Sequence, residues 1–276
     1  MSITSPLIYF DTDTFHNFAE TFKDRPLPSD LRDQIVFSPI TLMEVFSHLA
    51  VEWGPLVHQQ IKGLPNWINK NHVVVLLYIN DAIAKIAFGV PLPEIGFAKA
   101  AQENMNVLLN CDLAEVYETA TIRRNELNRI KSEYAGYLKD TAEYFRKVPL
   151  TDEEFTKFWF AGLKRRVHLE SSTKSAAEVV SALSAYYEFE LTQLKVAVAN
   201  VKYNFEKHRN DLFDVEQMIY LKDDNLHFLA IDGGYRTKVV NSPLRSKIHE
   251  VPRTRLTDPI SAEEVLRELV ASASVR

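Results

Sequence analysis

A short apolar run near the N-terminus stops at acidic residues, and this feature constrains the fold most. The run is Leu7-Ile8-Tyr9-Phe10, and Asp11-Thr12-Asp13-Thr14 follows it directly. A brief apolar run bounded by polar residues is typical of a buried strand. In α/β proteins, ligands usually bind beyond the carboxyl ends of such strands. We therefore expect Asp11 at a ligand-binding edge of a sheet.

A second apolar run with the same kind of ending lies close to the other end of the chain. Leu226–Ile231 is followed by Asp232, Gly233 and Gly234. Two strands that each end in an aspartate are expected to be parallel neighbours with adjoining carboxyl ends. Strand-like residues also occur at 35–38, 73–77 and 247–251, although 73–77 fits a buried helix equally well. The sequence thus predicts an α/β fold with a central parallel sheet.

The residues between these strands have a different character. From about Phe97 to Lys207, helix formers dominate and glycine occurs only at Gly136 and Gly162. This composition predicts a large all-helical insertion. We divide the chain into a discontinuous core at 1–90 and 205–256, a helical insertion at 91–204, and a C-terminal tail with a short helix at 257–276.

Apolar residues at helical spacing, together with capping residues, predict individual helices. The first expected helix begins at Thr14, which would cap it, and ends at about Lys23, and a second begins near Pro39 to Thr41. A third begins at Thr151, with Glu154 in its capping box. Two more are expected at Ser175 to about His208 and at Ser261 to Val270.

Composition limits the classes of protein that this chain can belong to. It has 276 residues, a formal net charge of −5 and one cysteine, Cys111. The negative charge argues against a surface that binds nucleic acid over its whole area. A lone cysteine forms no intrachain disulfide and no zinc-thiolate cluster, and no stretch is as long and apolar as a membrane span. We expect a cytoplasmic protein that does not associate with membranes.

Two further carboxylates are predicted to reach the same edge of the sheet. Glu44 follows the 35–38 strand, near the start of the next helix, and Asp214 lies in the first turn of a helix that precedes Leu226–Ile231. Alternatively, Glu44 stabilises the helix end, and Asp211 caps the later helix. With Asp11 and Asp232, four elements would each contribute one carboxylate.

Such a group of like charges requires a compensating cation or protonation of some members. Oxygen-only ligands favour Mg²⁺ or Mn²⁺ over zinc, and the eight histidines show no metal-ligand spacing. The sequence therefore predicts a magnesium or manganese site at Asp11, Glu44, Asp214 and Asp232. The basic clusters at 123–131 and 164–168 are predicted to be solvated helix faces rather than phosphate-binding surfaces.

These acidic segments carry a family resemblance. The segments at 8–15, 38–44, 210–214 and 230–235 resemble, in order, the four acidic motifs of PIN-domain nucleases. The resemblance implies a PIN-like three-layer α/β/α fold with a central parallel sheet, and metal-dependent hydrolysis of phosphodiester bonds, in RNA rather than DNA. It also implies that the four carboxylates are catalytic, with Asp13 and Asp211 as outer or water-mediated partners. An inhibitory protein partner and a homodimer stay open.

Two other functions compete with a nuclease. A PIN-like scaffold could keep the acidic residues and bind RNA or protein without cleaving it. Asp11-Thr12-Asp13-Thr14 also resembles the opening motif of haloacid-dehalogenase-like phosphatases, in which the first aspartate is a nucleophile and the second a general acid. Thr14 stands where those phosphatases have glycine.

Overall fold

The computed structural model describes residues 6–68, 75–91, 109–231 and 233–274. Its sheet has three parallel strands in the order β1-β2-β3, with bounds β1 Leu7–Phe10, β2 Leu226–Ile231 and β3 Ile248–Val251. The first strand of the chain therefore pairs with a strand from its last quarter. This confirms the predicted α/β fold with a parallel sheet.

Single pairs extend the sheet on the free side of β1. Ile35 pairs with Ile8 and Phe37 pairs with Val75, both in parallel orientation. The segment predicted as a strand at 35–38 thus runs beside β1, although it forms isolated bridges rather than a continuous ladder. The expected strand or helix at 73–77 lies partly outside the described residues, and its described part includes Val75.

Alternate residues of the strands face two different hydrophobic cores, because successive side chains of a strand point to opposite sides of the sheet. Tyr9 and Phe228 lie in one core, whereas Ile8, Phe10 and Leu229 lie in the other. Helices supply most of the other buried residues of both cores. The sheet is therefore covered by helices on both faces, which explains why β1 and most of β2 are apolar.

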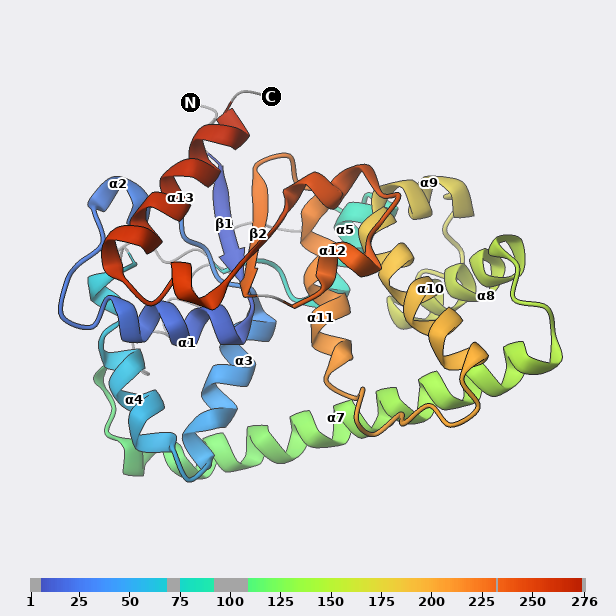
Figure 1. Ribbon diagram of the computed structural model, residues 1–276. Helices are drawn as coiled ribbons and strands as arrows, with labels where there is room; N and C mark the ends of the chain where they lie inside the picture. The colour runs from blue at the N-terminus through green and yellow to red at the C-terminus, as the bar shows by residue number, and fades with distance from the viewer. Residues whose placement is uncertain (1–5, 69–74, 92–108, 232, 275–276) are drawn as a thin grey trace.

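The described helices surround this small sheet (Figure 1). The α-helices are α1 Thr12–Thr21, α2 Ser29–Arg32, α3 Pro39–Ser47, α4 Gly54–Lys62, α5 Ile79–Phe88, α7 Leu113–Lys147, α8 Asp152–Arg166, α9 Ala176–Ala182, α10 Ser184–Ala199, α11 Asp211–Gln217, α12 Tyr235–Lys238 and α13 Pro259–Ser274. The 3-10 helices are η1 His48–Ala50, η2 Leu64–Asn66, η3 Met218–Lys222, η4 Pro243–Lys247 and η5 Arg253–Arg255. Among the described residues, no helix combines the length and the apolar character needed to cross a membrane.

The long helix α7 connects the predicted insertion to the rest of the molecule. Figure 1 shows α7 running along one side of the molecule, past α3 and on to α10, both of which it contacts. Val116 and Ala120, near its start, belong to the core of Ile8 and Phe10, whereas Leu127 and Leu138 belong to the core of Tyr9. The helical segment therefore packs into both cores of the sheet.

Three of the predicted helices differ from those observed, and two of them precede the tail. The first helix begins at Thr12, and its N-cap is Asp11, whose Oδ1 accepts a hydrogen bond from the Thr14 backbone N–H at 2.9 Å. Asp11 therefore does the capping that was expected of Thr14. The single helix expected over Ser175–His208 is broken at Leu183 into α9 and α10 and ends at Ala199.

The tail contains a longer helix than predicted. Asp258 accepts a hydrogen bond from the Ser261 backbone N–H at 2.9 Å, so the helix begins at Pro259 rather than at Ser261. Ala262 and Leu266 of α13 are fully buried in the core that contains Ile8 and Phe10. Residues 259–274 are thus part of the packed fold.

Candidate functional site

Asp11 lies at the carboxyl end of β1, as the sequence predicted. Its capping bond to Thr14 fixes one carboxylate oxygen, and the other, Oδ2, lies 3.3 Å from the Tyr235 hydroxyl. Burial raises the pKa of Asp11 to about 6, against the opposing effect of these hydrogen bonds. This aspartate therefore holds a proton more readily than an exposed one.

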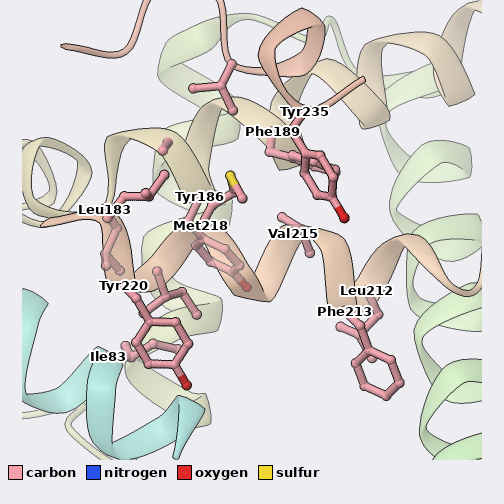
Figure 2. Close-up of a cluster of buried hydrophobic side chains, with 14 of the residues drawn as sticks. Ile83, Leu183, Tyr186, Phe189, Leu212, Phe213, Val215, Met218, Tyr220 and Tyr235 are labelled. Atoms are coloured by element: carbon pink, nitrogen blue, oxygen red, sulfur yellow. The ribbon is translucent and has the colours of Figure 1, made fainter. Parts of the chain in front are cut away.

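Asp214 approaches the same tyrosine from α11. It lies in the first turn of that helix, as expected, and its Oδ1 accepts a hydrogen bond from the Tyr235 hydroxyl at 2.8 Å. Figure 2 shows the hydroxyl of Tyr235 directed toward α11. Burial raises the pKa of Asp214 to about 7, with a smaller contribution from Asp211 and Asp11. Tyr235 thus joins two carboxylates that are distant in the sequence.

The two contacts of Tyr235 compete for one hydrogen. A phenol carries a single O–H, so it can donate to Asp11 or to Asp214 but not fully to both. The raised pKa values of the two aspartates fit this arrangement, because a proton retained by one carboxyl group relieves the repulsion between them. Such a pair titrates as a unit. Because these pKa values are about 6 and about 7, the pair is partly protonated near neutral pH, and a cation could replace the proton that remains.

Glu44 lies farther along its helix than predicted. No acidic residue occupies the first turn of α3, so the alternative in which Glu44 stabilises the helix end is wrong. Its Oε2 accepts a hydrogen bond from the Thr12 hydroxyl at 2.7 Å, and its Oε1 lies 3.0 Å from the Lys131 ammonium. Glu44 also contributes to the raised pKa of Tyr235, after burial and the two aspartates. The charges of Asp11, Glu44 and Asp214 therefore all raise the pKa of the Tyr235 hydroxyl.

The expected outer partners occupy different surroundings. The side chain of Asp13 is 72% exposed and lies 3.9 Å from Arg253. Asp211 accepts a hydrogen bond from Gln193 at 3.0 Å and lies 3.2 Å from His208. The N-cap of α11 is Asn210, so the alternative in which Asp211 caps this helix is wrong. Asp232, the fourth predicted ligand, lies outside the described residues.

Comparisons of the chain with protein-family models, with curated proteins and with solved structures find no match. The chemistry of the site therefore has to follow from its side chains.

The described carboxylates are not arranged as a complete metal-binding site. Within the described ranges, no three His, Cys, Asp or Glu side chains are grouped so that they could hold a metal ion. The donors nevertheless fit Mg²⁺ or Mn²⁺ in type, because carboxylates supply the hard oxygen ligands that these ions prefer. Binding of a cation at Asp11 and Asp214 would require the loss of their remaining proton, a shift of the Tyr235 hydroxyl and a closer approach of the carboxylates.

Tyr235 and Lys131 were not identified as site residues from the sequence. A signal for Tyr235 exists in the two glycines that precede it, Gly233 and Gly234. Gly234 has a φ of 67°, and a Cβ on Gly233 would lie 2.1 Å from the Tyr235 ring. The two glycines therefore allow the ring to fold back toward the carboxylates.

A pair of histidines lies close to Glu44, although the histidine spacing predicted no such pair. His16 Nε2 is 3.1 Å from His48 Nδ1, and His16 Nδ1 is 2.7 Å from Gln60 Oε1. Burial, followed by the charges of His16 and Lys131, lowers the pKa of His48 to about 4. His48 is therefore neutral at pH 7.

Both basic clusters contain a residue that differs from the prediction, because Lys131 of the first cluster is largely buried beside Glu44 and Arg166 of the second pairs with a buried residue. Arg166 was expected on a solvated helix face. Instead, its guanidinium forms an ion pair at 2.5 Å with Glu216, which is buried, and donates to Asn80 Oδ1 at 2.8 Å. The guanidinium of Arg166 is therefore engaged in an internal ion pair rather than in binding a phosphate backbone.

Proposed function

We propose that this protein is a PIN-like nuclease that hydrolyses phosphodiester bonds, in RNA rather than DNA, with Mg²⁺ or Mn²⁺. The observation that carries the proposal is the meeting of Asp11 and Asp214 at the Tyr235 hydroxyl. These aspartates are distant in the sequence and half-buried: Asp11 directly follows β1, and Asp214 lies in the first turn of α11. Burial raises the pKa of both carboxyl groups, although Lys238 lowers that of Asp214, and a role in binding a further cation would explain why buried carboxylates meet here.

Asp11, Glu44 and Asp214 are the described residues that would hold the ion, with Asp232 as the predicted fourth ligand. A bound divalent ion supplies a water of lowered pKa and neutralises charge on the leaving oxygen. The chain itself orients the ligands: the Thr14 backbone N–H fixes one oxygen of Asp11, and Thr12 fixes one oxygen of Glu44. Tyr235 keeps the two aspartates together.

One observation favours a non-catalytic scaffold as a second candidate. Glu44 already has a cationic partner in Lys131, so part of the acidic group is neutralised internally. A scaffold of this kind would bind RNA or protein with no response to metal. The phosphatase is less well supported, because its general acid would be Asp13, whose side chain is largely exposed.

Cleavage assays distinguish these functions. Single-stranded RNA, structured RNA, single-stranded DNA and a phosphomonoester would be incubated with Mn²⁺, Mg²⁺ or chelator. We expect metal-dependent cutting of RNA that falls at least about a hundredfold in Asp11→Asn, Asp214→Asn and Asp232→Asn. Asp140→Asn, on the exposed face of α7, is the matched control.

The contrary outcomes are equally specific. Turnover of the phosphomonoester that requires Asp11 and Asp13 would support the phosphatase and refute the nuclease. RNA binding without cleavage, unaffected by metal or chelator, would support the scaffold.

A further inference from the structure

Lys131 reaches the carboxylates from the helical insertion. It lies on α7, and its ammonium is 3.0 Å from Glu44 Oε1. The two side chains are only 14% and 18% exposed. Most other ion pairs on α7 and α8 join exposed residues of the same helix, such as Arg129 and Glu133. The pair of Lys131 and Glu44 is therefore a tertiary contact in a partly desolvated place.

A second contact places the Lys131 ammonium between Glu44 and the segment that carries Asp214. Lys131 Nζ lies 4.6 Å from the centre of the Phe213 ring, and Phe213 directly precedes Asp214. In Figure 2 the Phe213 ring lies apart from Tyr186 and Tyr220, at the other end of α11. On the opposite side, Thr12, which follows Asp11, donates to the remaining oxygen of Glu44. Both oxygens of Glu44 are thus engaged.

We infer that Lys131 is an internal cation that holds Glu44 in the metal-free protein and must be displaced when a divalent ion binds there. This inference rests on the proposed function. A lysine ammonium is a compact charge on a flexible stem, so it can neutralise a carboxylate and also leave it. Because Glu44 Oε1 accepts from Lys131, the ion and the lysine compete for the same carboxylate. The helical insertion then controls how readily the site is loaded.

The competition predicts that Mn²⁺ binds more tightly when the charge of Lys131 is removed. In Lys131→Gln we expect Mn²⁺ affinity to rise by about tenfold, which corresponds to about 1.4 kcal/mol. Lys139→Gln, at an exposed position of the same helix, is the matched control and should change the affinity by less than about twofold. Lys131→Arg keeps the charge and offers two donors to the carboxylate, so it should weaken Mn²⁺ binding.

The measurement is calorimetric titration of the 276-residue protein with Mn²⁺, with Asp11→Asn as the site control. Tighter binding in Lys131→Gln and weaker binding in Lys131→Arg support the inference. If the wild type binds Mn²⁺ in an Asp11-dependent manner but Lys131→Gln binds it equally or less tightly, the inference fails and the proposed metal site stands. If none of these variants binds Mn²⁺, both fail.

A double-mutant cycle separates displacement from a purely structural role. Unfolding of the wild type, Lys131→Gln, Glu44→Gln and the double variant would be compared in chelator and in saturating Mn²⁺. Displacement predicts coupling between the two residues in chelator and its loss in Mn²⁺. Equal coupling in both conditions would show that the ion pair persists and would overturn the inference.

Discussion

Replacement of Asp214 by asparagine should stabilise the metal-free protein above neutral pH. Burial raises the pKa of this carboxyl group from 3.8 to about 7. Because the folded pKa lies above the unfolded one, stability is fully present below pH 3.8 and is lost as the pH rises through about 7. Asparagine does not ionise, and its oxygen can still accept the hydrogen bond from Tyr235.

The size of the gain follows from this shift. One pKa unit is equivalent to about 1.4 kcal/mol, so the full shift corresponds to about 4 kcal/mol once the aspartate is ionised. Asp214 is only half-buried, so water screens part of this penalty. We therefore expect Asp214→Asn to raise the free energy of unfolding by about 2 kcal/mol at pH 8 and by close to zero at pH 4.

Urea unfolding in chelator at pH 4, 6 and 8 measures this gain. The matched control is Asp140→Asn, which should stay within about 0.5 kcal/mol of the wild type at each pH because its side chain is exposed. A gain that does not increase with pH, or a loss of stability at pH 8, would refute the argument that burial disfavours the ionised form of Asp214.

Two further predictions concern packing. Arg166→Met leaves the buried Glu216 without its cationic partner, so we expect a loss of about 3 kcal/mol in urea unfolding, largely recovered by adding Glu216→Gln; no recovery in the double variant would show that the loss does not arise from the ion pair. Leu266→Ala, in α13, should cost about 2–5 kcal/mol because the side chain is fully buried. Glu264→Ala, on the exposed face of the same helix, is the control, and equal effects would mean that α13 does not pack as described.

Features set by neighbouring residues were largely predictable. The strands at Leu7–Phe10 and Leu226–Ile231 are where the apolar runs occur, because a short buried strand needs such a run. The N-caps Thr151 and Ser175 also lie where expected, since a cap depends on residues within one helical turn. The end of α5 at Gly89, with a φ of 71°, has the same local origin.

Features set by distant residues were not predictable in this way. The sequence pattern of 175–208 fits one helix, yet the chain breaks at Leu183, a residue fully buried in the core of Tyr9. The tail helix was expected to be short, yet the hydrogen bond to Asp258 lets it start earlier, and its Leu266 side chain is buried in the core. In both segments the packing of α9, α10 and α13 against other elements outweighs the local pattern.

The same distinction between local and distant causes applies to the candidate site. The sequence by itself determined that Asp11 follows a strand and that Asp214 lies in a first helical turn, because strand ends and helix starts are encoded in adjacent residues. Only the tertiary structure decided that Tyr235 lies between these aspartates and that Lys131 pairs with Glu44. The reason is physical: those contacts depend on where the sheet and α7 bring their side chains in space, and no periodicity or spacing along the chain records that position.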